Sequence, residues 1–194
     1  VLFRSNRASC AVSEAAQPTA DPAALAAWVD RRGAPKRSTA ELDRETIRRF
    51  VQAIMDRDPV YYDDAHAATT RYHTLVAPAL FPVHAFRTAA DAPDPLVSVQ
   101  LDPDADGTAG NDGMYFGLPP IEHPFKRLLN GGNEIEFYRC LALGERCVAQ
   151  ARYANVQLKE GRSGTMLMVD IETEFRTEAG EVLLINRQTR SEEH

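Results

Sequence analysis

The apolar residues in the first half of the chain recur at the spacing of a helix. Between residues 43 and 54 they fall at positions i, i+3, i+4 and i+7, which lie on one face of a helix. These residues are Ile47, Phe50, Val51 and Ile54. Asp43 precedes them and can accept hydrogen bonds from the first free backbone N–H groups. The pair Asp58-Pro59 predicts the end of this helix, since proline disfavours helical backbone at the residue before it.

Two shorter helices are predicted on either side of this one. The first has Asp21 as its N-cap and Pro22 at its first position, and it ends near Gly33. The second opens at Pro59.

From residue 133 onward the apolar period changes from helical to two. Four segments alternate between apolar and polar residues, and glycine-containing turns separate them at hairpin spacing. They are residues 134–138, 146–156, 165–175 and 181–188. We expect an antiparallel meander with one polar and one apolar face. Together with the preceding helices it predicts an α+β domain whose sheet wraps one helix.

The connection between the two halves, residues 91–124, is long and rich in proline, glycine and aspartate. A loop of this length predicts a lid or an interface segment. Its residues 102–107 match the start of an EF-hand calcium loop, but Gly113 stands where the bidentate glutamate is needed. We therefore interpret it as a solvated acidic loop and predict no metal site.

The composition is that of one soluble globular domain, with 194 residues, 44% of them apolar and 26% charged. A net charge of −6 argues against nucleic-acid binding, and no apolar run approaches the roughly 20 residues of a membrane span. The three cysteines lack metal-ligand spacing, which favours a reduced, cytoplasmic compartment. We expect Cys140 and Cys147 in strands, as buried small residues.

Both ends of the chain have an interpretation outside the fold. Residues 1–5 can be encoded by GTGCTCTTCCGATCT and residues 190–194 by AGATCGGAAGAGCAC, its reverse complement. This string is a sequencing-library adapter, so we interpret both tails as adapter-derived. The predicted organisation is then an N-terminal extension with a short helix at 6–37 and one domain at 38–189.

A short motif links this domain to a known family. The stretch Met55-Asp56-Arg57-Asp58-Pro59-Val60-Tyr61 resembles Gly-Asp-x-Asn-Pro-Leu-His, the signature of MaoC-like (R)-specific enoyl-thioester hydratases. Residues 75–82 resemble the entry to the central helix of that family, and residues 130–139 resemble one of its strands. The branch is that of the MaoC dehydratase N-terminal, or fungal-synthase-like dehydratase, domains. The resemblance implies a hot-dog fold, a curved antiparallel sheet wrapped round a central helix.

The same resemblance implies candidate catalytic residues. Adding water across an enoyl thioester needs a base for the water and an acid for the α-carbon, and the family uses a carboxylate and an imidazole. Asp56 keeps the carboxylate, whereas Tyr61 occupies the histidine position. A tyrosine, with an ordinary pKa of about 10, is a poor base at neutral pH. The chain therefore looks like a relative that has lost half of the catalytic pair.

Candidate substrate-binding residues come from the other two segments. They are Phe81 and His84 in the central helix, and Gly131, Gly132 and Asn133 at the strand. His84 can face the acyl tunnel, or it can be a core or interface histidine bonded to backbone. The glycine pair can allow close approach of a ligand, or it can form a plain turn. Arg139 is a further candidate, for the phosphates of coenzyme A.

Our leading hypothesis is a catalytically degenerate hot-dog half of an (R)-specific enoyl-CoA hydratase or 3-hydroxyacyl-thioester dehydratase. It would form the acyl tunnel for an acyl-CoA or acyl-carrier thioester, while a partner subunit or second domain supplies the Asp/His pair. Hydro-lyase activity is then expected only in that assembly, without a cofactor. The alternative is a non-catalytic scaffolding or binding module of an acyl-CoA enzyme complex. Both hypotheses predict a side-by-side dimer of hot-dog units in the cytoplasm, with no nucleic acid or membrane as partner.

Overall fold

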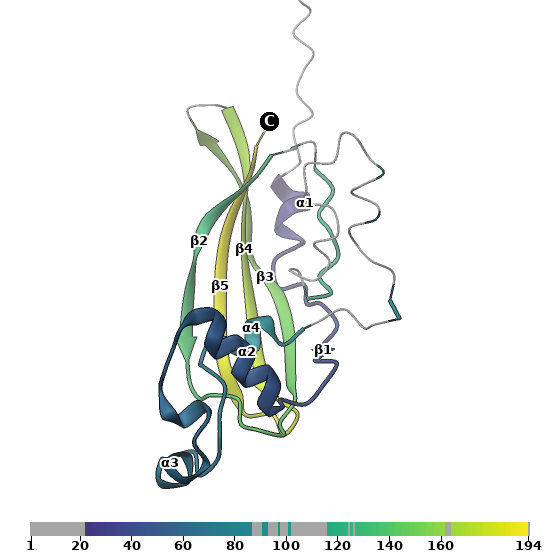
Figure 1. Ribbon diagram of the computed structural model, residues 1–194. Coiled ribbons are helices and arrows are strands. Elements are labelled where there is room, and N and C mark those ends of the chain that lie inside the picture. The colour runs from purple at the N-terminus through teal and green to yellow at the C-terminus, as the bar shows by residue number, and fades with distance from the viewer. Residues whose placement is uncertain are drawn as a thin grey trace, which may run out of the picture.

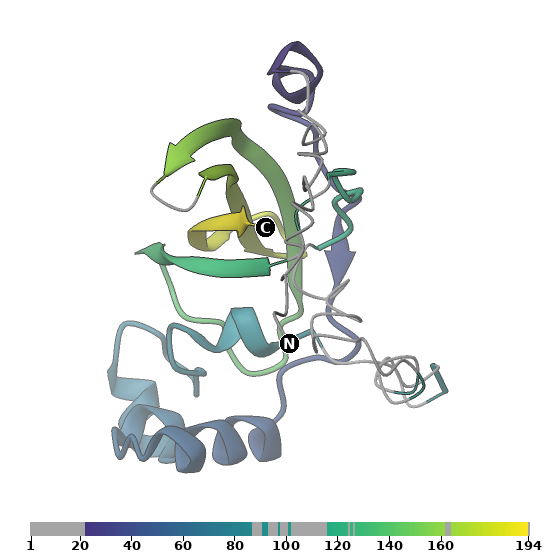
Figure 2. The ribbon, with the colours of Figure 1, turned by 90° about the horizontal axis from the view of Figure 1, so that it is seen from above.

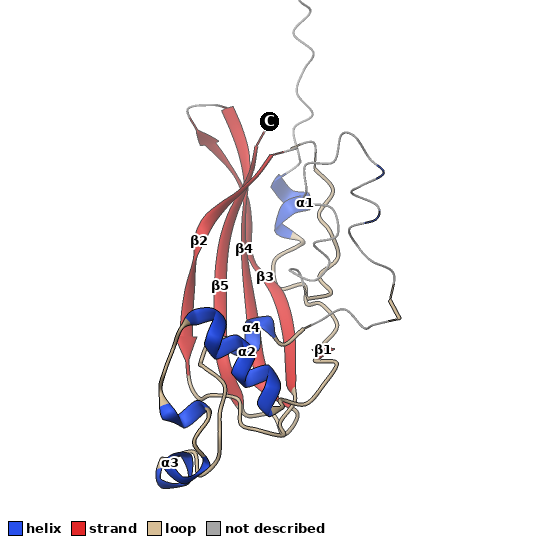
Figure 3. Ribbon diagram, in the orientation of Figure 1, coloured by secondary structure: helices blue, strands red, loops and turns tan. Residues whose placement is uncertain are grey.

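The computed structural model describes residues 22–86, 91–92, 97, 101, 116–123, 125, 127–161 and 164–193. A five-stranded antiparallel sheet carries short helices on one side (Figures 1 and 3), which confirms the α+β expectation. The elements are α1 Pro22–Ala26, β1 Lys36–Arg37, α2 Arg44–Ile54, η1 Pro59–Tyr61, α3 Asp64–Thr69, α4 Phe81–His84, β2 Arg127–Phe137, β3 Cys147–Gly161, β4 Gly164–Thr177 and β5 Val182–Glu193.

The four long strands lie where the period-two pattern predicts them, and β3, β4 and β5 form the predicted meander, but the predicted place of β2 is wrong. The order in the sheet is β1-β3-β4-β5-β2, so β2 pairs with β5 and not with β3. Phe137, at the end of β2, lies opposite Leu184 of β5. The chain then crosses the end of the sheet, where Ala142 pairs with Val76. Alternation identifies a strand and its faces, but the neighbour of β2 depends on this non-local contact.

The long strands curl strongly (Figure 2), and their two faces differ in polarity. On β4, Val169, Ile171 and Phe175 are buried, whereas the residues between them are partly exposed and acidic at Glu172 and Glu174. This alternation buries one face of the sheet and leaves the other in water. We call the buried, concave face the inner face.

Helix α2 begins as predicted and ends early. The Asp43 carboxylate accepts a hydrogen bond from the N–H of Thr46 at 2.7 Å, and Ile47 and Val51 are buried. The helix stops at Ile54 because Met55 takes a left-handed conformation, with φ 56°. The predicted stop at Asp58-Pro59 is therefore wrong by a few residues, and that pair opens η1 instead.

The expected central helix corresponds to α4, which has four residues. Pro82 lies in its first turn, and the buried Phe81 ring stands edge-on to Phe50 at 5.3 Å. Figure 2 shows α4 between the sheet and α2. After α4, Phe86 reaches the inner face, where its ring centroid lies 6.0 Å from that of Phe175.

The two edges of the sheet differ. The N–H groups of Asp30 and Gly33 donate to the carbonyls of Tyr153 and Ala151 at 2.8 and 2.9 Å, so the segment before α2 covers β3. At the other edge, β2 is largely exposed along its length and pairs only with β5 among the described strands. Among the described residues, the sheet therefore has one covered edge and one open edge.

Other sequence predictions concern the cysteines, the acidic loop and the ends of the chain. The acidic stretch 102–107, Cys10 and residues 1–5 lie outside the described residues. Cys147 is buried in β3 as expected, but Cys140 lies in the loop after β2 and is half-buried. Residues 190–193 continue β5. Within the described residues, none of the helices has the length and apolar character needed to cross a membrane.

Candidate functional site

The degenerate motif forms a tight turn between α2 and α3. The Asp56 carboxylate accepts a hydrogen bond from the N–H of Asp58 at 3.1 Å. The Asp58 carboxylate in turn accepts one from the N–H of Val60 at 3.0 Å and caps η1. The motif aspartates therefore hold the loop that presents Tyr61, a role their short side chains favour before a proline turn.

This turn brings Asp56 and Tyr61 together. Burial is the main cause that raises the pKa of the Tyr61 hydroxyl to about 12, and the negative charge of Asp56 adds to it. A weaker contribution comes from a hydrogen bond between the two side chains. Tyr61 is therefore a protonated phenol at neutral pH, which can donate a hydrogen bond but cannot take a proton from water.

Two further residues lie beside this pair that sequence reasoning missed. The Tyr72 hydroxyl lies 3.5 Å from the Cys140 sulfur and accepts a hydrogen bond from Arg71 at 2.6 Å. Cys140 is also close enough to contribute to the raised pKa of Tyr61. Because Cys140 and Tyr72 are 68 residues apart, no local pattern in the sequence could have shown the contact.

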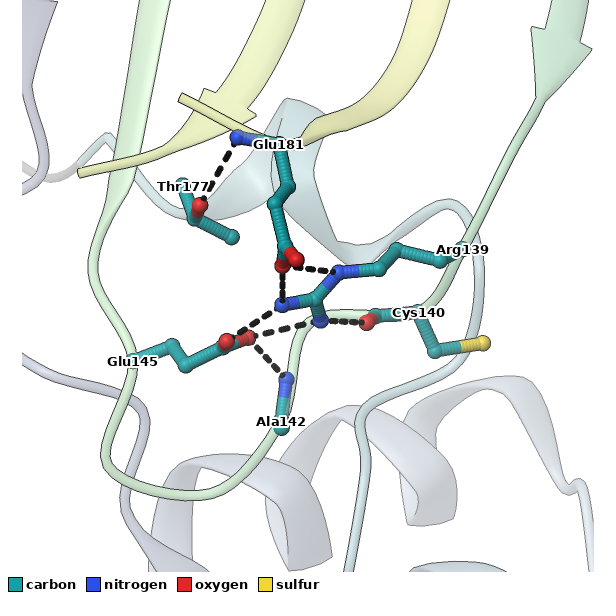
Figure 4. A network of polar contacts seen from close by, with 6 residues as sticks. All are labelled: Arg139, Cys140, Ala142, Glu145, Thr177 and Glu181. Atoms are coloured by element: carbon teal, nitrogen blue, oxygen red, sulfur yellow. Dashed lines mark hydrogen bonds and ion pairs between the residues drawn. The ribbon is translucent and has the colours of Figure 1, made fainter. Parts of the chain in front are cut away.

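The loop that carries Cys140 is held by Arg139 (Figure 4). Its guanidinium donates to the carboxylates of Glu145 and Glu181 at 2.9 Å each, and to the Cys140 carbonyl at 2.8 Å. Glu145 also accepts the N–H of Ala142 at 2.8 Å. These hydrogen bonds, first of all that of Glu145, raise the pKa of Arg139. Two carboxylates thus engage Arg139, so its sequence-based assignment to coenzyme A phosphates gains no support.

Phe81 and His84 lie at a different place. Both line a cavity of about 450 Å³ between α2, α4 and residues 38–42. Phe81 is buried, whereas His84 is exposed and its ring centroid lies 5.3 Å from that of Phe50. Asp56 and Tyr61 do not line this cavity.

Gly131, Gly132 and Asn133 lie at a third place, a bulge in β2. They line a shallow groove of about 520 Å³ together with Asp170 and Thr189, among others. Gly132 has φ 123°, which strains any residue with a side chain. Five residues of strand, about 16 Å, separate it from the end of β2. The structure therefore unites Asp56 with Tyr61 but distributes the seven predicted site residues over three places.

Metal ligands do not gather in the described residues. No group of three or more histidine, cysteine, aspartate or glutamate side chains there could hold an ion. The chemistry of the motif turn consists of two carboxylates, two phenols, a thiol and a guanidinium.

A known protein has a similar sequence. The chain is 29% identical over 170 residues to a protein named "Probable enoyl-CoA hydratase alpha subunit" from Thermomonospora curvata. That alignment covers 84% of this chain and 49% of the relative, so the chain spans about half of the relative's length.

Solved structures show the same architecture. One is the ChsH1-ChsH2 complex from Mycobacterium tuberculosis, with a TM-score of 0.60, 17% identity and 84% of each chain covered. Another is the MaoC-like dehydratase from Rhodospirillum rubrum, with a TM-score of 0.54, 14% identity, and 86% of this chain and 92% of that chain covered. Likeness at such identities shows the fold, and it confirms the expected hot-dog fold. A family model described as "FAS1-like, dehydratase domain region" matches residues 32–185, well over half of the sequence, and the chain belongs to that family.

Proposed function

We propose that this chain is the catalytically incomplete hot-dog half of an (R)-specific enoyl-CoA hydratase or 3-hydroxyacyl-thioester dehydratase. It contributes to the acyl-binding tunnel, and a partner subunit or a second domain supplies the Asp/His pair. The observation that carries the proposal is the tyrosine at the histidine position, since the pKa of Tyr61 is raised to about 12.

The chemistry explains why this tyrosine matters. Hydration forms a C–O bond at the β-carbon from water and places a proton on the α-carbon. A group that is deprotonated near pH 7 must accept the proton of the water, and an acid of similar pKa must return one. Asp56 can orient water through its carboxylate. Tyr61 cannot alternate between acid and base at this pH, so an imidazole has to come from elsewhere.

The open edge supports a partner. Strand β2 lies at the edge of the sheet among the described strands, and most of its eleven residues are exposed. Unpaired strand edges are sites of association. Phe137 and Tyr138 at its end are 52% and 56% exposed. Met55, in the motif loop, is 83% exposed. Pairing of β2 with a second hot-dog unit would cover this edge. The names of two similar proteins, an alpha subunit and a ChsH1-ChsH2 complex, support an assembly of two units.

A scaffolding module is the second candidate, and a specific observation favours it. The residues predicted to bind substrate lie in two separate hollows, neither of which contains Asp56 or Tyr61. A chain that only stabilises an acyl-CoA enzyme complex in the cytoplasm would need the open edge but no tunnel.

Reconstitution tests the leading proposal. The chain is mixed with a hot-dog protein that carries Gly-Asp-x-Asn-Pro-x-His, and hydration of enoyl-CoA is followed. We expect activity in the mixture, loss of activity when the partner's motif histidine is replaced by alanine, and little change with Asp56→Asn. Hydration by the isolated chain that Asp56→Asn abolishes would contradict the proposal.

A further inference from the structure

The inner face of the sheet changes from apolar to polar along β5. Leu184 lies opposite Phe175, and both are fully buried. Two residues further, Asn186 lies opposite Thr173, and then Gln188 lies opposite Ile171. Because alternate residues of a strand share a face, Asn186 and Gln188 belong to the same face as Leu184.

The neighbouring strand extends this polar region. On β2, Asn133 lies opposite Gln188, so it shares the inner face. We call Thr173, Asn186, Gln188 and Asn133 the inner polar row. Their neighbours on the same face of β4, Ile171 and Phe175, are apolar and buried.

One atom of the row is both buried and unpaired. The Oδ1 of Asn186 is shielded from water and lacks a hydrogen-bond partner within the described part of the chain. Thr173 beside it is 4% exposed. A buried acceptor without a donor is unfavourable, and a leucine at the same place would avoid the penalty. The site therefore calls for a hydrogen-bond donor that comes from a bound molecule.

The row carries no formal charge. Arg190 and Glu192 follow Gln188 along β5 on the same face. They form an ion pair with each other at 3.4 Å, and Glu192 also pairs with His123. The opposite charges of Arg190 and Glu192 offset each other beyond the row. The inner polar row itself offers only amide and hydroxyl groups. These groups suit a neutral donor such as an alcohol rather than a carboxylate or a phosphate.

The position of the row connects it with the acyl chain of the proposed ligand. Phe86, which follows α4, and Phe116 both pack on Phe175, at 6.0 and 5.2 Å between ring centroids. The two rings cover the inner face as far as Phe175. The inner polar row begins at Thr173, which precedes Phe175 by two residues on β4 and lies on the same face. Ile135 of β2, an apolar residue, lies directly opposite Asn186.

We propose that the inner polar row binds a hydroxyl group on the acyl chain of the ligand, so that this protein selects hydroxylated acyl thioesters over plain ones. This inference rests on the proposed function, because it assumes that the inner face lines the acyl site. The hydroxyl donates to Asn186 Oδ1 and can accept from Thr173 or Gln188. A plain alkyl chain leaves these groups unpaired.

The test is binding of acyl-CoA to the full chain, measured by isothermal titration calorimetry. The probes are decanoyl-CoA and a set of hydroxydecanoyl-CoA isomers with the hydroxyl on each carbon from the fifth to the tenth. The wild type should bind at least one isomer about fivefold more tightly than decanoyl-CoA, the effect of one net hydrogen bond. Asn186→Leu should remove this preference and bind decanoyl-CoA at least as tightly as the wild type.

Two more variants complete the experiment. Thr173→Val keeps the shape of the side chain and should reduce the preference for the hydroxydecanoyl-CoA isomer. It provides an independent test of the row if Asn186→Leu fails to fold. Glu174→Gln, on the opposite face of β4, should change neither affinity. Binding of decanoyl-CoA without preference for any isomer, or a preference that survives both substitutions, would overturn the inference alone. Binding of no acyl-CoA at all would overturn the proposed function together with it.

Discussion

Tyr61 lies beside Asp56, and burial together with that negative charge raises the pKa of the Tyr61 hydroxyl to about 12. In the MaoC-like signature that the motif resembles, the corresponding position holds a histidine, whose ordinary pKa is about 6.5. This chain therefore has the carboxylate of the signature at Asp56. In place of the histidine, which titrates near pH 7, it has Tyr61, which does not titrate near that pH.

Restoring the imidazole should therefore restore some chemistry. The isolated chain is expected to hydrate crotonyl-CoA at a negligible rate. Tyr61→His places a titratable ring beside Asp56 and should raise the rate by at least about tenfold, a smaller factor than the roughly 10²–10⁴-fold that well-positioned acid–base groups contribute. Hydration is measured from the loss of enoyl absorbance. Tyr61→Phe is the matched control and should leave the rate unchanged. A rate in the wild type within tenfold of a complete MaoC-like enzyme would show that another residue already replaces the histidine.

The raised pKa also predicts a change of stability with pH. The folded pKa of Tyr61 is about 12, and the unfolded value is about 10. Folding therefore favours the protonated phenol. Its contribution to the free energy of unfolding is complete below pH 10 and is lost as the pH rises toward 12. Urea denaturation at pH 9 and pH 11 measures the change.

Tyr61→Phe isolates this contribution, because phenylalanine cannot ionise. Between pH 9 and pH 11 the wild type should lose more stability than the variant does. Equal losses would mean that Tyr61 ionises at its ordinary pKa and is not buried beside the carboxylate.

The end of α2 offers a test of backbone strain. Met55 has φ 56° and its side chain is 83% exposed, while the N–H of Asp56 donates to the Val51 carbonyl at 3.2 Å. The left-handed conformation costs residues other than glycine about 1–2 kcal/mol. Met55→Gly should therefore raise the free energy of unfolding by about 1 kcal/mol, as measured in urea. Met55→Ala removes the side chain without relieving the strain, so it should give no gain. A loss with Met55→Gly would contradict the account.

These residues also show how far the sequence could be read. The apolar stripe and Asp43 predicted the start and the buried face of α2 because both signals are local. The predicted end of α2 lies a few residues too late in the sequence. Glycine is the usual sequence signal for a left-handed residue at the end of a helix, and this position holds Met55. Period two predicted the long strands for the same local reason.

Contacts distant in sequence remained hidden. Nothing in the pattern of β2 indicates that it pairs with β5, because alternation fixes faces and not neighbours. The resemblance to the family identified Asp56 and Tyr61. The approach of Cys140 to Tyr72, and the distribution of Phe81, His84 and the glycine pair over separate hollows, depend on packing across the whole domain.

The open edge predicts the state of association. We expect the chain to be a dimer of hot-dog units in solution, because a strand with an unpaired edge, such as β2, associates unless that edge is covered. Phe137→Lys places a charge at this edge and should shift the protein to monomers, as measured by small-angle X-ray scattering at micromolar concentration. Val29→Lys changes a residue that is 37% exposed beside the covered edge, and it should leave the dimer intact. A monodisperse wild-type monomer would contradict the prediction.

The last prediction separates a tunnel from a scaffold. Ala79 is half-buried in the segment that leads into α4, where the wall of an acyl tunnel is expected. Ala79→Trp should narrow that tunnel in the reconstituted complex. Each methylene of the substrate that is buried contributes about 0.8 kcal/mol, so long enoyl-CoA substrates lose more than short ones. The measurement is kcat/KM over a series of chain lengths.

Leu80→Trp is the control for this experiment, because Leu80 is adjacent in sequence and 39% exposed. It adds the same indole ring outside the expected wall and should change kcat/KM equally little at every chain length. A scaffolding chain predicts a different result for Ala79→Trp, either no effect or the same factor for short and long substrates, since the scaffold touches no part of the acyl chain. A flat profile would therefore remove the tunnel role and leave the scaffold. A profile that falls with chain length only in Ala79→Trp would support the tunnel, because loss of complex stability alone cannot depend on the substrate.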